Sequence, residues 1–378
     1  MIITLVIDQY GEDNNGTTMT ARRLSQVLRE HGHQVRILAG ECSGEEELYE
    51  TGYLKFPGVY QICRSQGMVL AKANKEIIKK ACDGADIVHF LLPFKLARKT
   101  KEYCDKMGIP TVAAFHCQPE NITSTLHLGK SKLANNLIYA NFRKFYNKFS
   151  DVHTPSKMME DQLLKHGYTS KIHPISNGVS PFFKPKQVEK PEALKDKFVI
   201  LMIGRYSIEK RQDLIIEAVK KSKYEKDIQI ILAGKGPWHN HLKEVSADLT
   251  NSVIFGFYQP DELLDVINYA DLYIHASDAE SEAISCIEAF SCGKVPVISN
   301  SPLAATNQFA LDEHCLFEQG NSDSLREKID FFIENPEFKA SLALKYIEYG
   351  QEFQLDNCVT KLEDIFKAVA LRNKVSQQ

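Results

Sequence analysis

Two glutamates eight positions apart, Glu280 and Glu288, are the residues whose type and spacing first suggest chemistry. Glu280 follows an apolar stretch at 272–275 that predicts a buried strand, and Glu288 lies in the short helix predicted next. The carboxyl ends of parallel strands face the ligand crevice of an open α/β sheet, and the first amides of the following helix favour a phosphorylated or polyhydroxy ligand. Most helix carboxylates are simply solvated, so this interpretation depends on the residues that accompany the pair.

A second group of candidates follows the strand predicted over 198–203. Gly204 permits close approach, Arg205 offers a fork of donors to phosphate oxygens, and Lys210 opens the next helix. Two cations beside a helix N-terminus are well placed to stabilise a departing diphosphate. The alternative is that both are surface charges on a turn, but their position at a strand–helix junction favours an anion site.

Further candidates lie at other predicted strand ends. His116 follows the strand at 111–115 and could donate to a sugar hydroxyl or a reacting oxygen near neutral pH. Gly16, after the first strand, could bring its amide close to a phosphate, and the edge near Gly234 and Gly256 could receive a base. A lone histidine is more often structural, and Gly16 could equally belong to an ordinary β–α turn.

Strands alternating with helices predict two doubly wound parallel sheets, an α/β fold. We expect an N-terminal domain at 1–180, a Pro- and Lys-rich linker at 181–197, a second domain at 198–352 and a returning C-terminal helix at 353–378. Residues 42–68 read as irregular. The predicted strands are 2–7, 35–39, 87–92, 111–115, 198–203, 228–233, 253–255, 272–275 and 295–299, and the helices include 18–31, 71–82, 96–107, 323–333, 339–348 and 356–369.

Composition narrows the class of protein. The 378 residues are 43% hydrophobic and 25% charged, as in soluble globular proteins, and the sequence has neither a membrane-length apolar run nor a signal-peptide start. Nine scattered cysteines without a C-x-x-C pair favour reduced thiols in the cytoplasm over disulfides or zinc. No D-x-D pair is present to hold a metal–diphosphate complex, so we expect no metal, and we expect no nucleic-acid partner.

Charge is unevenly distributed along the chain. Residues 1–185 contain 24 Lys and Arg against 18 Asp and Glu, whereas the remainder contains 22 against 31. A basic first half suits an anionic surface, either membrane lipid or a phosphorylated acceptor. A modest statistical fluctuation would explain the same numbers.

The segment 130–149 is both basic and aromatic. Four apolar residues form one helical stripe, and several lysines and arginines surround it. Such a helix can lie in a membrane interface; alternatively, the stripe packs on the sheet and the cations are solvated. We favour membrane contact by Lys132, Ile138, Phe142, Arg143, Lys144, Phe145, Lys148 and Phe149.

Taken together, several motifs resemble the retaining glycosyltransferases of family 4, which have the two-domain GT-B fold. These motifs, in chain order, are NNGTT, GHQV, FHCQPEN, SNGV, GRYSIEK, GKGP and ESEAISCIEAFSCGKVPVISNSP. More narrowly, the chain resembles bacterial cholesterol α-glucosyltransferases, and relatives that glycosylate diacylglycerol or ceramide, in the segments DQYGEDNNGTTMTARR, LPF and NSPLAATNQFALDE.

The resemblance implies two Rossmann-like domains facing across a cleft, a UDP-glucose or UDP-galactose donor, retention at the anomeric carbon and no required metal. By motif position, Arg205 and Lys210 would hold the diphosphate, Glu280 the hexose, Glu288 the ribose, and His116 would contact the sugar near the reacting centre. The implied donor-binding set is Gly16, Gly204, Arg205, Lys210, Gly234, Gly256, Glu280, Ala283, Ile284 and Glu288.

One departure from the family pattern affects the donor loop. The common family form follows the first glutamate with Gly-Phe-Gly, whereas this chain has Ser281, Glu282 and Ala283. Without glycine's freedom, the backbone contacts to the donor and the choice of sugar become less certain.

The resulting hypothesis is a cytoplasmic enzyme on the inner face of the cell membrane that transfers a hexose to a lipid acceptor. Two alternatives stay open: a transferase with a soluble polysaccharide or lipopolysaccharide acceptor, and a nucleotide-sugar epimerase or binding protein of the same fold.

Overall fold

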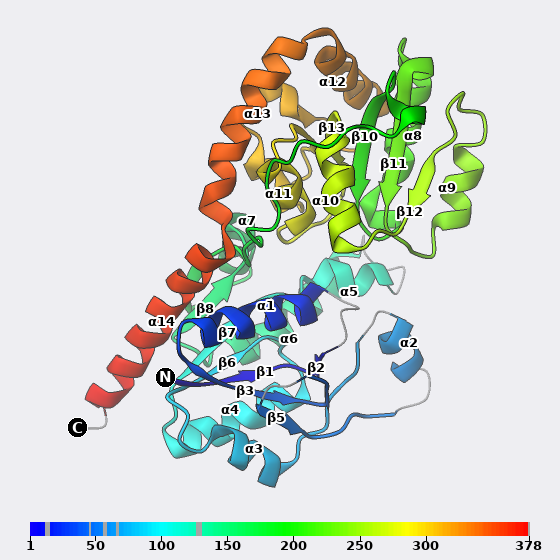
Figure 1. Cartoon of the computed structure of the whole chain (residues 1–378). Coiled ribbons are helices and arrows are strands. Elements are labelled where there is room, and N and C mark those ends of the chain that lie inside the picture. Colours follow the sequence, from blue (N-terminus) through cyan, green and yellow to red (C-terminus); the bar gives the residue numbers. More distant parts are fainter. Residues whose placement is uncertain (12–15, 45–46, 56–58, 66–67, 126–130, 377–378) are drawn as a thin grey trace. The chain divides into compact units, whose positions relative to one another are not determined.

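The computed structural model describes residues 1–11, 16–44, 47–55, 59–65, 68–125 and 131–376 (Figure 1). The chain divides into two compact units. The first comprises Met1–Asn177 together with Leu355–Gln378, and the second comprises Gly178–Gln354. The stretch 181–197, predicted as a linker, therefore belongs to the second unit.

Among its described residues, the first unit contains a seven-stranded sheet in the order β5-β3-β1-β6-β7-β8-β9, with every pair parallel. The order reverses between β1 and β6, which makes the carboxyl ends of these strands the topological switch point. The strands are β1 (Ile2–Val6), β3 (Gln34–Ala39), β5 (Glu47–Glu50), β6 (Ile87–Phe90), β7 (Thr111–Ala114), β8 (Asp151–Thr154) and β9 (Lys171–Pro174), and β2 (Gln9–Tyr10) pairs separately with β4 (Glu41–Cys42).

Helices cover both faces of this sheet, because its strands are apolar on both sides. One core packs β6, β7 and β8 against the helices α3, α4, α6 and α7, and the other packs β1, β3 and β6 against α1 and α14. The helix α14, which follows the second unit in sequence, thus completes the first. The helices are α1 (Gly16–Glu30), α2 (Val59–Ser65), α3 (Lys75–Cys82), α4 (Lys95–Met107), α5 (Pro119–Thr125), α6 (Lys132–Tyr146), α7 (Lys157–Lys165) and α14 (Leu355–Ser376).

The second unit is built in the same way around a parallel sheet, six-stranded within the described residues, in the order β12-β11-β10-β13-β14-β15. Here the order reverses between β10 and β13. The strands are β10 (Phe198–Ile203), β11 (Ile228–Ala233), β12 (Ile254–Gly256), β13 (Leu272–His275), β14 (Pro296–Ser299) and β15 (Leu316–Phe317). The helices are α8 (Gln212–Lys221), α9 (His239–Val245), α10 (Pro260–Tyr269), α11 (Ile284–Ser291), α12 (Ser322–Glu334) and α13 (Pro336–Gly350).

The predicted fold class, two doubly wound α/β units, is confirmed. Three local predictions are wrong. The helix predicted over 71–82 begins only at Lys75, because the Asn74 side chain accepts hydrogen bonds from the amides of Glu76 and Ile77 and caps the helix there. The stretch 42–68, read as irregular, contains β5 and α2, and the short helix α5 was not predicted.

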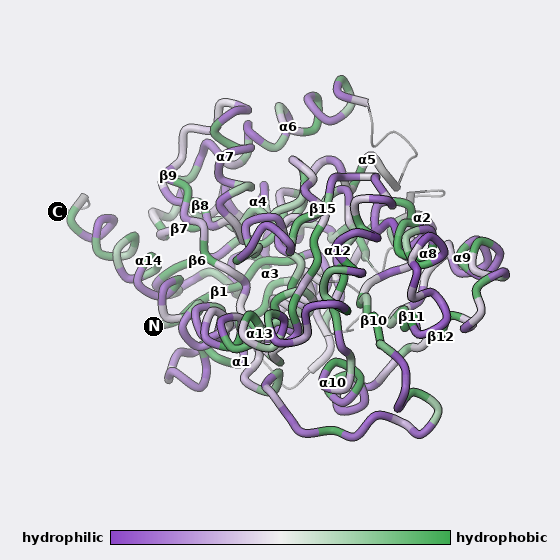
Figure 2. Tube along the Cα trace, turned by 90° about the horizontal axis from the view of Figure 1, so that it is seen from above, coloured by the Kyte–Doolittle hydropathy of each residue, from purple (hydrophilic) through white to green (hydrophobic). Residues whose placement is uncertain are grey.

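The aromatic side of α6 faces the core. Phe142, Phe145 and Phe149 are only 5%, 1% and 3% exposed, and Ile138 packs against the same cluster. The three phenylalanines are therefore core residues, and the prediction that they contact a membrane is wrong. Figure 2 shows both hydrophobic and hydrophilic residues along α6. Its exposed residues include the predicted cations Lys132, Arg143 and Lys144 together with Leu133 and Leu137, and Lys148 is exposed just beyond its end.

No helix among the described residues is long and apolar enough to cross a membrane.

Candidate active site

The strongest cluster of predicted residues lies at the switch point of the second unit. The Lys210 ammonium donates to Glu280 Oε2, joining the segment after β10 to the loop after β13. The Glu280 backbone is held as well, because its amide donates to the Leu303 carbonyl at 3.0 Å and its carbonyl accepts from the Ala305 amide at 2.8 Å. A cation and a carboxylate are thus fixed side by side where an open α/β sheet binds ligands.

The charge on Glu280 follows from these neighbours. Burial alone would raise its pKa, but the Lys210 charge and the nearby His275 ring outweigh burial and lower the pKa to about 2. Glu280 is therefore ionised near neutral pH. An ionised carboxylate can accept hydrogen bonds from sugar hydroxyls, and the neighbouring ammonium can contact phosphate oxygens.

The glycines of this edge bring the protein's own segments together. The Gly234 amide donates to the Gly256 carbonyl, and a Cβ on Gly234 would lie 2.0 Å from the Gly204 carbonyl oxygen. A Cβ on Gly256 would collide with the Tyr258 ring. These contacts explain glycine at Gly234 and Gly256 through packing of the β10, β11 and β12 ends.

The other predicted donor-binding residues of this unit lie in or directly after two segments, the one that follows β10 and the one between β13 and α11. Arg205 is exposed directly after β10, and its carbonyl accepts from the Gln212 side chain at 2.8 Å. Glu288 is buried within α11, with 7% of its surface exposed, and Ile284 is the first residue of that helix. Ala283 precedes the helix in the left-handed conformation, with φ 66° and ψ 70°. The missing glycine is therefore replaced by a strained alanine.

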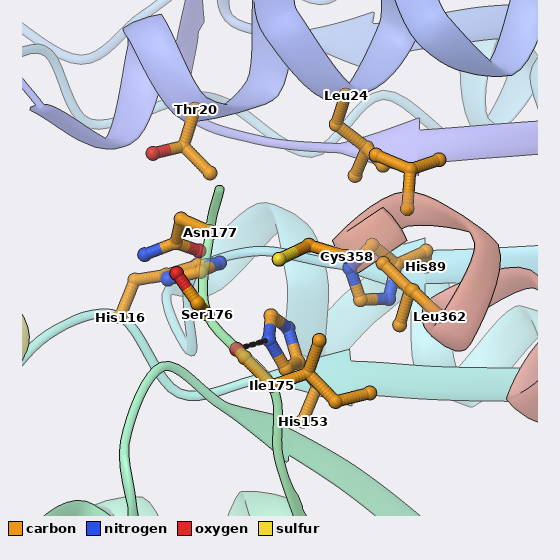
Figure 3. A pocket seen from close by; sticks show the side chains of 11 residues that line it. Thr20, Leu24, His89, His116, His153, Ile175, Ser176, Asn177, Cys358 and Leu362 are labelled. Carbon is orange, nitrogen blue, oxygen red and sulfur yellow. Dashed lines mark hydrogen bonds between the residues drawn. The ribbon is translucent and has the colours of Figure 1, made fainter. Parts of the chain in front are cut away.

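In the first unit, His116 lies after β7 beside a pocket that α1, α14 and the strand ends form (Figure 3). Thr20, Ser176 and Asn177 line the pocket together with it, and the His116 and His153 ring centroids are 5.6 Å apart. Burial lowers the pKa of His116 well below its usual range. The neutral ring has one N–H donor and one acceptor nitrogen, which suits contact with a hydroxyl group.

The histidines behind His116 are deeply buried. His153 contacts the Ile175 carbonyl at 2.6 Å through Nε2, as the dashed line in Figure 3 marks. Burial lowers the pKa of His153 to about 4 and that of His89 to about 3. These two rings are neutral parts of the core.

Gly16 is the exposed first residue of α1, and a Cβ there would meet nothing within 4 Å. The neighbouring Asn14 and Asn15 of the predicted turn lie outside the described residues. No group of three or more His, Cys, Asp or Glu among the described residues is arranged to hold a metal.

Two residues beneath Glu280 were missed by the sequence reasoning. His275 Nε2 lies 3.4 Å from Glu280 Oε2, and the Tyr273 hydroxyl lies 3.2 Å from His275 Nδ1. A signal was present in the sequence, because the buried strand LYIH carries a polar atom on every second residue, and alternate residues share one face of a strand. Asp8, buried at the end of β1 with its pKa raised to about 7 by burial, was also missed.

Two doubly wound parallel-sheet units, one with a cation–carboxylate pair at its switch point, have the architecture of the GT-B class. Two family descriptions match the chain: "Glycosyltransferase Family 4" over residues 14–181 and "Glycosyl transferases group 1" over 183–353. The chain belongs to glycosyltransferase family 4.

Individual relatives are more distant. The alpha-monoglucosyldiacylglycerol synthase of Streptococcus pneumoniae is 26% identical over 79% of this chain and 71% of that protein. A glycosyltransferase structure from Rickettsia africae has a TM-score of 0.74 at 20% identity and covers 97% of this chain and 98% of that one. The catalytic domain of a cholesterol-α-glucosyltransferase from Helicobacter pylori is 44% identical and covers 41% of this chain and 99% of that one. Its TM-score of 0.39 is too low to bear on the fold.

Proposed function

We propose that the chain is a retaining hexosyltransferase that moves glucose or galactose from a UDP-sugar to the hydroxyl group of a membrane lipid, forming an α-glycolipid. The observation that carries the proposal is the Lys210–Glu280 pair at the switch point of the second unit, where Arg205 is exposed directly after β10. This arrangement offers cations to a diphosphate and a carboxylate to the attached sugar. The similarity to a monoglucosyldiacylglycerol synthase supports a lipid acceptor.

In the proposed reaction, the bond between the anomeric carbon and the UDP oxygen breaks while the acceptor oxygen bonds the same face of that carbon. The acceptor's proton goes to the departing phosphate oxygen. Arg205, Lys210 and nearby amides neutralise the charge that develops on the diphosphate, so these fixed cations replace a metal. Glu288 would hold the ribose, and neutral His116 would contact the sugar near the reacting centre.

Glu280 acts here as a hydrogen-bond acceptor rather than as a nucleophile. Its carboxylate is already engaged by Lys210, and its low pKa makes it a weak base. Its expected contribution is to hold hexose hydroxyl groups, since well-placed hydrogen bonds of this kind orient the anomeric carbon for attack.

The outer face of α6 supports a membrane acceptor. Leu133 and Leu137 are 73% and 63% exposed one turn apart, and Lys132, Lys144 and Lys148 are exposed on the same segment. Exposed leucines among lysines suit the interface of an anionic bilayer, the leucines entering the boundary layer and the lysines pairing with lipid phosphates. These exposed residues support the proposal that the enzyme acts at the inner face of the cell membrane.

The proposal is tested by incubating the purified full-length chain with UDP-glucose, UDP-galactose, GDP-glucose or GDP-mannose. Each donor is offered with sterol, diacylglycerol or ceramide in liposomes, or with a soluble oligosaccharide. Mass spectrometry identifies the product, and NMR establishes its anomeric configuration. We expect an α-glycolipid from a UDP-sugar, unchanged by chelator. Transfer only to the soluble acceptor, or conversion of the donor without transfer, would favour one of the alternatives instead.

Two variants test the site within the same assay. Glu280→Ala and Arg205→Ala should each lower kcat by about two orders of magnitude or more, because each removes a charge aimed at the donor. Lys220→Ala is a matched control, since this cation pairs with the exposed Asp248 on the surface of the same unit. Near-native turnover in Glu280→Ala or Arg205→Ala would remove that residue from the proposed site.

A further inference from the structure

A buried polar network lies beneath Glu280, where β10, β13 and α11 meet (Figure 1). Ser285 Oγ lies 3.3 Å from the Ile203 carbonyl oxygen, and the Tyr273 hydroxyl lies 3.1 Å from Ser285 Oγ and 3.2 Å from His275 Nδ1. Tyr273 and His275 are both fully buried. Polar groups so deep in an α/β core are costly unless they are paired, so their arrangement calls for an explanation.

The hydrogen atoms of the network can be assigned from its chemistry. Burial lowers the pKa of His275, so the ring is neutral and has a single N–H. If that N–H were on Nδ1, the lone pair of Nε2 would face the ionised Glu280 carboxylate at 3.4 Å, which is repulsive. With the proton on Nε2, the ring turns an N–H toward Glu280 at 3.4 Å, an electrostatic contact longer than a hydrogen bond. Nδ1 then accepts the single hydrogen of the Tyr273 hydroxyl, and the Tyr273 oxygen accepts in turn from the Ser285 hydroxyl.

The same contacts orient the Glu280 carboxylate. Lys210 and His275 both contact Oε2, and no described residue hydrogen-bonds to Oε1. One oxygen is therefore engaged by the protein, and the other is available to hydroxyl groups of a sugar. Lys210 has a second role in the proposed reaction, because it must also contact the diphosphate. When it turns toward the phosphate, His275 is the side chain that remains in contact with Oε2, at 3.4 Å.

We propose that Tyr273 and His275 are positioning residues for the donor sugar. Tyr273 fixes the ring so that the Nε2–H faces Glu280, and His275 in turn holds the carboxylate with Oε1 toward the hexose. The inference rests on the proposed function, in which Glu280 binds the transferred sugar. Neither residue touches the donor, so their effect is on how well Glu280 is placed.

Amide replacements of His275 provide the sharpest test. His275→Gln can place an N–H near the position of Nε2, whereas His275→Asn reaches only the position of Nδ1. We expect His275→Gln to keep kcat/KM for the UDP-sugar within about threefold of the native value. His275→Asn and Tyr273→Phe should lower it by about tenfold to a hundredfold, because small misplacements of a positioning group have effects of this size. Inhibition by UDP should stay unchanged in all three, since UDP has no sugar for Glu280 to hold.

Controls separate this inference from misfolding and from failure of the proposed function. Tyr168→Phe removes a buried hydroxyl that donates to the Tyr139 carbonyl in the first unit, and it should leave the donor kinetics unchanged. Thermal unfolding and UDP inhibition establish that each variant is folded. If Glu280→Ala is active, the proposed role of Glu280 fails. If Glu280→Ala is inactive but Tyr273→Phe and His275→Asn are native-like, or if His275→Gln loses as much as His275→Asn, the positioning role is overturned.

Discussion

Replacing the exposed leucines of α6 tests whether its outer face binds a membrane. In Leu133→Asn/Leu137→Asn, two side chains that are 73% and 63% exposed become polar. Full burial of one leucine contributes about 1.5–3 kcal/mol, and an interfacial helix buries only part of its apolar face. Because the two side chains are already partly covered, only their exposed surface can enter the interface. Burying about half of that surface on both leucines gives roughly 1–2 kcal/mol, so we expect liposome partitioning to fall about fivefold to thirtyfold.

The assay is flotation with liposomes of neutral or anionic lipid, alongside urea unfolding. The variant's stability should change by less than about 0.5 kcal/mol, since both positions are on the surface. Phe142→Ala, on the buried side of the same helix, should instead cost about 3–5 kcal/mol of stability. Leu344→Asn is the matched control, because this leucine is 69% exposed on α13 in the second unit.

The lysines supply the electrostatic part of the same prediction. Neutralising Lys144 and Lys148 should weaken binding to anionic liposomes by about 1 kcal/mol for each charge and leave binding to neutral ones unchanged. Donor hydrolysis should be nearly unaffected. Native partitioning in both the leucine and the lysine variants would refute the membrane role of α6.

Three further predictions concern single residues. Ala283→Gly should leave the free energy of unfolding unchanged or raise it by about 1 kcal/mol, because glycine relieves the left-handed strain. The control Ala289→Gly, inside α11, should lower it by about 1 kcal/mol or more. Equal effects of the two substitutions in urea unfolding would contradict this reasoning. Asp8 has its pKa raised to about 7, so it stays protonated in the folded state while the unfolded state ionises, and stability falls as pH rises from about 4 to 7. Asp8→Asn should remove that slope and add roughly 4 kcal/mol above pH 7, while an unchanged pH profile would refute the assignment. Glu280→Gln frees Lys210 from its carboxylate partner, so UDP binding measured by calorimetry should tighten by about threefold to thirtyfold, although sugar transfer falls. Weaker UDP binding would contradict the proposal that Lys210 binds the diphosphate and Glu280 binds the sugar.

The strands of the second unit could be predicted from sequence because they are buried on both faces. The runs at 198–203, 228–233 and 272–275 are apolar except for Gln229 and His275, and glycine or polar residues follow each run. They match β10, β11 and β13 residue for residue. Short apolar runs of this kind indicate strands of a parallel sheet, because such strands are buried on both faces. The strand ends, and with them the positions of Arg205 and Glu280, then followed from the alternation of strands and helices.

The orientation of α6 could not be predicted in the same way. Helical spacing correctly placed Phe142 and Phe145 on one face, but it does not say whether a sheet or a bilayer covers that face. Long-range packing decides this, because Phe90 and Phe115, far away in sequence, pack edge to face against Phe145 and Phe142. The exposed pair Leu133 and Leu137, on the opposite face of α6, was not singled out, because helical spacing alone does not say which face is left uncovered.

The donor loop shows how neighbouring structure can enforce a conformation that its sequence disfavours. With Ala283 in place of glycine, local preference argues against a left-handed residue before α11, yet the chain adopts it. Hydrogen bonds on either side of Ala283 restrain this conformation. The Glu280 amide and carbonyl bond to residues 303 and 305, and the Ser285 hydroxyl contacts β10 and β13. Strain persists where the structure around it is over-determined, and it gathers at functional sites. Because the loop is restrained at both ends, it holds Glu280 in a fixed position without the help of glycine. The replacement of Gly-Phe-Gly by Ser281, Glu282 and Ala283 therefore changes how the loop is held, while the Glu280 carboxylate stays at the switch point.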